Sequence, residues 1–126
     1  MTNDYLVSVE NRLHGYHTRL KELHYSAPSH SIHVIIDEFD KALQEFDDRI
    51  MEDAQSIFGF IQPGTVNPIL PQEMEIEELL RSIRAMLAEM KNELTEKLYT
   101  GILNTVDDFW SEVNRTIYLI MTAKKG

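Results

Sequence analysis

Hydrophobic residues recur along the chain at intervals that alternate between three and four positions, within four long segments. The first segment keeps this spacing from Leu6 to Leu23, and the second keeps it from Ile36 to Ile57. Such intervals place one apolar stripe along a helix, whereas a half-buried strand would alternate at every second residue. The pattern predicts helices at four places, roughly residues 4–25, 29–58, 72–99 and 102–123.

Glycine and proline are concentrated between these segments and mark where the helices are expected to end. Ser29 is placed to cap the second helix, and Pro71 with the glutamates after it suits the start of the third. The chain is expected to turn around Gly101. Four helices of this length, with no segment that alternates like a strand, predict an all-α four-helix bundle forming one domain over residues 1–126.

The composition limits the kind of site that the bundle can carry. The chain contains no cysteine, so a metal site would have to use histidine and carboxylate side chains. Its 21 acidic and 12 basic residues give a net charge of −9, which opposes binding to nucleic-acid phosphates. No apolar run approaches the ~18 residues of a membrane span, and the N-terminal segment does not read as a signal peptide. We expect a soluble, cytoplasmic protein with no nucleic-acid or membrane partner.

Four polar residues of the second predicted helix share one face, opposite its apolar stripe: His33, Asp37, Asp48 and Glu52. At about 100° per residue they lie at roughly 0°, 40°, 60° and 100° around the helix axis. Each pair one turn apart can share one ion, but the two pairs are about 22 Å apart along the helix. One helix cannot bring them together, and a solvated acidic face is the simpler interpretation of any single carboxylate.

A second copy of the helix can bring the four residues together. If two copies pack antiparallel about a two-fold axis, residues face each other when their numbers have a constant sum. The numbers of His33 and Glu52 add up to 85, and so do those of Asp37 and Asp48. A dimer would gain two equivalent sites of mixed imidazole and carboxylate donors, which suit Fe(II), Mn(II) or Zn(II). Burying these acids at a dimer seam without a cation would be costly.

Further imidazole donors lie in the first predicted helix. His24 stands at its end, just before the short connection into the second helix, so it can fold back near His33. His17 lies seven residues earlier on the same side and is a possible extra residue close to the metal. His14 forms another nearby pair with His17, and His30 lies in the connection between the two helices. For His14 and for His30, a position on the surface is the simpler interpretation.

These motifs resemble those of the Dps-type mini-ferritins, a branch of the ferritin-like four-helix proteins. The chain has "LHY" at residues 23–25, "HVIID" at 33–37 and "DRIME" at 48–52, with the family's ten-residue interval between the last two. The resemblance implies a ferritin-like antiparallel four-helix bundle. It also implies that one subunit contributes His24, His33 and Asp37 to a metal site, while its two-fold mate contributes Asp48 and Glu52.

The function implied by this resemblance is iron oxidation and storage. A mini-ferritin binds Fe(II) at the inter-subunit ferroxidase site, oxidises it with hydrogen peroxide or dioxygen, and stores Fe(III) as mineral, which protects against oxidative damage. The resemblance implies a homo-oligomer whose minimal unit is a two-fold dimer packed through the second helix. Such dimers are expected to assemble further into a twelve-subunit shell.

Three alternatives remain open from the sequence. A relative can keep the stripe and bind another divalent metal, such as Mn or Zn, in place of iron. A non-catalytic ferritin-like helical protein can use the acidic face to dock a partner, although such a face has no reason to place ligands symmetrically about a two-fold axis. An intrasubunit di-iron oxygenase ranks last, because the chain contains no Glu-x-x-His sequence.

Overall fold

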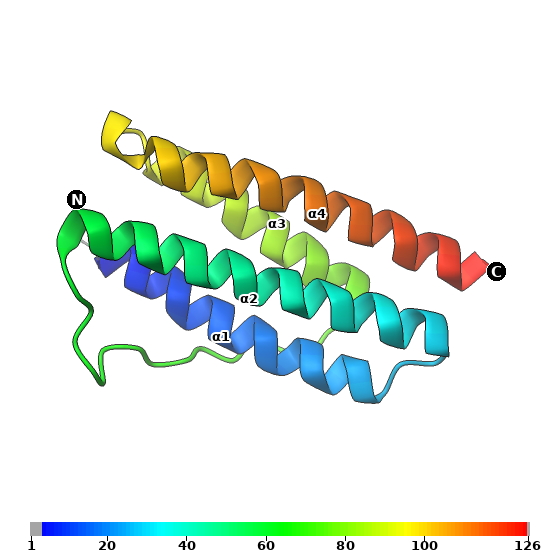
Figure 1. Ribbon diagram of the computed structural model, residues 1–126. Helices are drawn as coiled ribbons and strands as arrows, with labels where there is room; N and C mark the ends of the chain where they lie inside the picture. The colour runs from blue at the N-terminus through cyan, green and yellow to red at the C-terminus, as the bar shows by residue number, and fades with distance from the viewer. Residues whose placement is uncertain (1–3, 126) are drawn as a thin grey trace.

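The computed structural model describes residues 4–125, and most of these residues are helical (Figure 1). The long helices and one short 3-10 helix follow each other as α1 (Asp4–Tyr25), α2 (His30–Phe58), α3 (Ile76–Glu93), η1 (Lys97–Tyr99) and α4 (Thr100–Lys125). Within the described residues no strand is present. The fold class predicted from the hydrophobic spacing, an all-α four-helix bundle, is confirmed.

The helices pack in the order α1, α2, α4, α3 around the bundle, and α3 also contacts α1. Neighbouring helices run in opposite directions, so that α1 and α4 are parallel to each other, as are α2 and α3 (Figure 1). Phe46 and Phe109 stack with ring centroids 4.4 Å apart, and Phe39 stacks on the other side of Phe109 at 5.5 Å. This aromatic group fixes α2 against α4 in the centre of the core.

Because α2 and α3 are parallel, the chain must return the full length of the bundle between them. Residues 59–75 make this crossover and run along the outside of α1 (Figure 1). The backbone N–H groups of Asn67 and Ile69 donate to the side chain and main chain of Asn11, at 2.7 and 2.9 Å. Farther along, Arg19 donates to the carbonyl of Pro71 at 2.8 Å. The crossover is therefore tied to α1 at successive turns.

Gly15 is the position in α1 that lets the crossover approach so closely. A Cβ atom at residue 15 would lie 1.7 Å from the carbonyl oxygen of Ile69, far inside van der Waals contact. A glycine inside a helix costs about 0.5–1 kcal/mol relative to alanine, so its presence here has a packing reason. Gly15 is therefore the point where another part of the backbone contacts the predicted and observed helix.

The predicted boundaries hold for the first two helices and fail around the third. Ser29 caps α2 as expected, because its side chain accepts from the N–H of Ile32. The prediction that the third helix spans 72–99 is wrong at both ends. Residues 71–75 still belong to the crossover, and α3 ends at Glu93, where the fully buried Leu94 takes a non-helical conformation.

The expected turn at Gly101 is also wrong. The chain turns at residues 94–96, and η1 and α4 follow without a break, so that Gly101 lies in the first turn of α4. Thr100 donates to the carbonyl of Lys97 at 2.6 Å, and the buried Tyr99 anchors η1 in the core. The hydrophobic spacing continues through this region because Leu94 and Tyr99 are both buried, which hides the turn from the sequence pattern.

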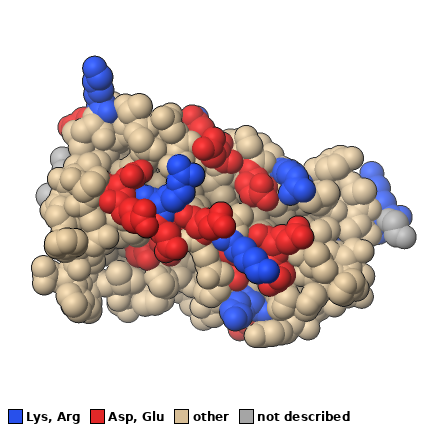
Figure 2. Space-filling view, viewed as in Figure 1, with Lys and Arg blue, Asp and Glu red and all other residues tan. Residues whose placement is uncertain are grey.

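The surface carries the acidic excess of the composition. On the face shown in Figure 2, acidic side chains form a broken band over α2 and its neighbours, with basic side chains among them. Among the helices of residues 4–125, none combines the length and the apolar character needed to cross a membrane.

Candidate metal centre

Polar residues meet at regular intervals along the contact between α1 and α2, here called the α1–α2 seam. Three pairs face each other: Glu10 with Asp47, His17 with Asp40, and His24 with His33. Successive pairs are seven residues apart on both helices, which is about 10.5 Å along a helix axis. The seam thus carries three polar levels, one with two carboxyls, one mixed, and one with two imidazoles.

At the end of the seam next to the connection between α1 and α2, the rings of His24 and His33 lie against each other with centroids 3.7 Å apart. His33 Nδ1 is 2.9 Å from the carbonyl oxygen of His24, and His24 Nδ1 is 3.3 Å from that of His33. A carbonyl oxygen can only accept, so each Nδ1 must carry the proton. Each neutral ring then presents the lone pair of Nε2, which is the form that binds a metal.

Asp37 follows His33 by one turn of α2 and stays half-exposed. It pairs with Lys41 at 3.2 Å, an exposed contact that contributes little to stability. His24, Asp37 and the pair of His17 with Asp40 line one pocket of about 230 Å³ between α1 and α2. One chain therefore brings three of the predicted ligands, His24, His33 and Asp37, into the same region.

His17, the predicted extra residue, belongs to the middle level of the seam. Its Nδ1 lies 2.7 Å from Oδ1 of Asp40, a carboxylate that is 8% exposed. Because an ionised carboxylate only accepts, Nδ1 carries the proton, and in the neutral form of the ring Nε2 is the atom with the lone pair. A carboxylate behind an imidazole in this way orients the ring and raises its basicity, as it does behind metal-binding histidines. Sequence reasoning did not identify the partner, Asp40.

The remaining predicted ligands, Asp48 and Glu52, are exposed on α2 and lie far along the helix from His33. The fold of one chain does not bring them to the paired histidines, in line with the spacing of about 22 Å along the helix axis. Their contribution to the site stays a prediction that requires a second subunit. Exposure on the outer side of α2 leaves both carboxylates free to meet one.

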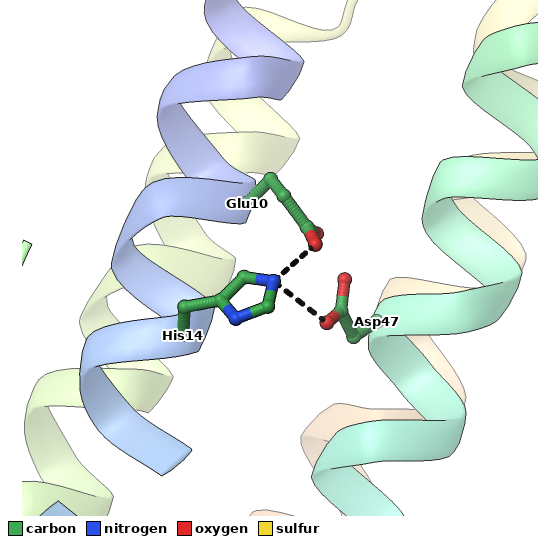
Figure 3. A group of neighbouring side chains, drawn as sticks. All are labelled: Glu10, His14 and Asp47. Carbon is green, nitrogen blue, oxygen red and sulfur yellow. Dashed lines mark hydrogen bonds and ion pairs between the residues drawn. The ribbon is translucent and has the colours of Figure 1, made fainter. Parts of the chain in front are cut away.

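At the other end of the seam, a cluster of Glu10, His14 and Asp47 could hold a metal ion within one chain (Figure 3). His14 Nε2 lies 2.8 Å from Glu10 Oε1 and 4.0 Å from Asp47 Oδ2. Glu10 and His14 are one turn apart on α1, and Asp47 reaches them from α2. The three side chains point toward one another in the space between the two helices.

Burial raises the pKa values of both carboxyls in this cluster. Glu10 is 7% exposed, and burial raises its pKa. Burial, the hydrogen bond to Glu10 and the charges of Glu10 and Asp48 together raise the pKa of Asp47 to about 8, against an opposing effect of His14. At neutral pH the two carboxyls are therefore best described as sharing one proton, since two buried like charges cannot both ionise cheaply.

Sequence reasoning missed Glu10 and Asp47 as site residues and treated His14 as a surface residue. The signal was nevertheless present, because the polar residues 10, 17 and 24 of the first helix repeat at the same interval as 33, 40 and 47 of the second. Two antiparallel helices bring such series together when each number of one adds to 57 with a number of the other. The sum rule derived from the sequence pairs α2 only with its own copy, and so it does not find this register between α1 and α2.

Comparisons with protein-family models, curated proteins and solved structures gave no match. The arguments about function therefore rest on the arrangement of the side chains.

Proposed function

We propose that this protein binds Fe(II) between two subunits, oxidises it with hydrogen peroxide or dioxygen, and stores the Fe(III). In this proposal His24, His33 and Asp37 of one subunit and Asp48 and Glu52 of its two-fold mate form the site. Iron is the substrate, and Mn(II) or Zn(II) is the alternative occupant. The chain would then act as a mini-ferritin that limits oxidative damage.

The observation that carries the proposal is the arrangement of the two imidazoles. Both are oriented by backbone carbonyls through Nδ1, so both offer Nε2, and Asp37 stands one turn away. Imidazole nitrogens bind Fe(II), while carboxylates favour the harder Fe(III) that oxidation produces. Two Fe(II) ions supply the two electrons that reduce one hydrogen peroxide, with two protons, to water. A mixed donor set therefore suits both oxidation states.

The connectivity of the bundle supports the same proposal. Four-helix bundles with one long crossover are typical of ferritin-like folds, whereas simple up-and-down bundles have only short loops. Here residues 59–75 form a single crossover along α1. Metal sites of such bundles are built on facing helices, as the α1–α2 seam is.

The test is an anaerobic Fe(II) titration of the metal-free protein, followed by peroxide addition, with the mass in solution measured on the same sample. We expect saturable binding of about one or two Fe(II) per chain and fast oxidation by a dimer or a larger shell. A monomer that binds no Fe(II) would overturn the proposal and favour a helical interaction protein. Tight Zn(II) or Mn(II) binding without Fe(II) oxidation would favour the other-metal alternative.

Mixing two variants tests whether the ligands come from different subunits. Asp37→Ala and Glu52→Ala each damage both sites of their own dimer, but a mixed dimer contains one intact site. Oxidation should therefore recover when the two variants are unfolded together and refolded. Asp108→Ala is the matched control, because Asp108 is an exposed acid between α2 and α4, away from the seam. No recovery in verified mixed dimers would rule out sharing between subunits.

A further inference from the structure

Glu10, His14 and Asp47 have no part in the proposed inter-subunit site, yet they form a compact donor group of their own (Figure 3). We propose that these three side chains are a second site for a first-row divalent cation, complete within a single chain. One imidazole and two carboxylates favour Zn(II), Mn(II) and Fe(II) within this class.

The geometry already approaches that of a coordination shell. One donor atom from each residue lies within 4.8 Å of the other two. An ion bound at about 2.1 Å from each donor needs donors roughly 3 to 4 Å apart, so small side-chain rotations close the shell. Glu10 and His14 start one turn apart on the same face of α1, and Asp47 closes the group from α2. No backbone movement is required.

A second observation is that one oxygen of each carboxyl in the cluster is left without a hydrogen-bond partner in the part of the chain that the structure describes. Glu10 Oε2 and Asp47 Oδ1 are buried oxygens without a hydrogen-bond donor among residues 4–125 when both carboxyls are ionised. Glu10 is more than nine-tenths buried and lies beside the other two residues of the cluster. An unsatisfied buried carboxylate is costly, and either a proton or a cation relieves the cost. A cation relieves it for both carboxyls, and His14 Nε2, which lies 2.8 Å from Glu10 Oε1, can coordinate the same ion once it has lost its proton.

The cluster has an open side, which a bound ion needs for entry and for water ligands. His14 has 45% of its side chain exposed, and with Asp47 it lines a pocket of about 260 Å³. Asp48 borders the same pocket, and its charge also acts on both carboxyls. Three protein donors with water in the remaining positions describe an exchangeable site better than a closed structural one.

Within one chain this second site lies far from the histidines that the chain contributes to the inter-subunit site, although Asp48, proposed for the site shared with the mate, borders its pocket. Glu10 and His24 are fourteen residues apart on α1, which is about 21 Å. All three donors belong to one chain, so the site does not depend on a dimer. Its existence can therefore be tested in a protein whose inter-subunit site has been removed.

The experiment starts from the Asp37→Ala/Glu52→Ala double variant, stripped of metal with a chelator. Zn(II) is titrated calorimetrically into this parent and into the same protein carrying Asp47→Asn. We expect one Zn(II) per parent chain, and binding weakened at least about tenfold by Asp47→Asn. Asp108→Asn, which removes an equal charge from the groove between α2 and α4, should leave Zn(II) binding unchanged.

A thermal melt distinguishes loss of a ligand from loss of the fold. Asparagine keeps the shape of Asp47 and can donate a hydrogen bond to Glu10, so the metal-free variant should melt no lower than the parent. Zn(II) should raise the melting temperature of the parent but not that of the Asp47→Asn protein. Equal Zn(II) affinity and equal Zn(II)-induced shifts in the two proteins would overturn the proposal.

A spectroscopic probe tests the nitrogen donor independently. Co(II), a coloured substitute for Zn(II), should develop a visible absorption band in the parent that shifts or disappears with His14→Ala. An unchanged Co(II) spectrum in a folded His14→Ala protein would also overturn the proposal.

Discussion

The two ends of the α1–α2 seam present their donors in different ways. At one end, His24 and His33 are held by backbone carbonyls, and the proposed carboxylates are Asp37 on the surface and acids from another subunit. At the other end, the carboxyls of Glu10 and Asp47 are packed around His14 in the same chain. The first end offers oriented imidazole donors without a carboxylate from residues 4–125 of their own chain between them, whereas the second confines two carboxyls that a proton or a cation must neutralise.

One pair of helices can therefore support two kinds of metal chemistry. Nitrogen donors that are oriented in advance, with acids supplied at an interface, couple metal binding to assembly. A buried pair of carboxyls couples metal binding to protonation instead. Substitution, dilution and pH should therefore affect the two ends differently.

The strongest test uses one substitution at each end, because each should remove the activity of its own end and leave that of the other. Asp37→Ala should lower the initial rate of Fe(II) oxidation on the order of a hundredfold while keeping the single-chain Zn(II) site, because ligand loss exceeds the effect of losing a supporting group. Asp47→Asn should weaken Zn(II) binding at the single-chain site and leave the rate of Fe(II) oxidation nearly unchanged. Stopped-flow absorbance for oxidation and calorimetry for Zn(II) measure the two effects. Equal losses of both activities in either variant would mean that the two ends form one site.

Dilution should separate the two ends without any substitution. Oxidation per chain should fall steeply once the protein concentration drops below the dimer dissociation constant, since Asp48 and Glu52 of each site come from the partner. Zn(II) bound per chain by the Glu10 end should stay constant over the same range. Mass measured by light scattering at each concentration provides the reference. Oxidation that persists unchanged in a verified monomer would contradict the shared site.

A substitution at Gly15 tests the crossover that passes between the two ends. Helix propensity alone predicts that Gly15→Ala stabilises the protein by about 1 kcal/mol. The carbonyl of Ile69, 1.7 Å from the added Cβ, predicts the opposite, and overpacking of this kind costs roughly 1–3 kcal/mol. We expect a lower melting temperature than that of the unsubstituted protein. The control is Gly101→Ala, whose nearest neighbour is at an ordinary 3.7 Å; stabilisation at both glycines would contradict the packing.

Much of this fold follows from local spacing. The hydrophobic intervals predicted the number of helices and the bounds of the first two, because burial of one stripe per helix is a local property of the sequence. The turn at residues 94–96 escaped prediction since Leu94 and Tyr99 remain buried on either side of it. The close approach at Gly15 escaped as well, because it depends on where a distant crossover lies.

The candidate site was predictable to the extent that its residues lie on one helix or at its connection. The contact of His24 with His33 followed from the short link between α1 and α2. The cluster of Glu10, His14 and Asp47 depends on the register between two helices, which is set by packing along their whole length. Polar positions repeat every seven residues on both helices and indicate that register. The repeat becomes apparent only when residues 10, 17 and 24 of α1 are compared with residues 33, 40 and 47 of α2.

The smallest expected effect is a pH dependence of stability that comes from the buried carboxyls. The pKa of Asp47 rises from 3.8 to about 8 on folding, so between these values the folded state binds the proton more tightly than the unfolded state. Stability from this group is thus fully present at low pH and is lost as the pH rises toward 8. Glu10, whose pKa also rises, acts in the same direction, while His14 opposes and Asp48 adds to the shift of Asp47.

Asp47→Asn removes this contribution together with the interaction between Asp47 and Glu10. In a chelator, the melting temperatures of the two proteins should be similar near pH 4 and should diverge by several degrees toward pH 8, with the variant melting higher, because about 1 kcal/mol shifts a domain of this size by roughly 4 °C. Saturating Zn(II) should abolish or reverse the difference at pH 8, since the cation then neutralises the carboxyls of the unsubstituted protein. A difference that is constant across the pH range would show that Asp47 is ionised in the folded chain and that its charge is already balanced.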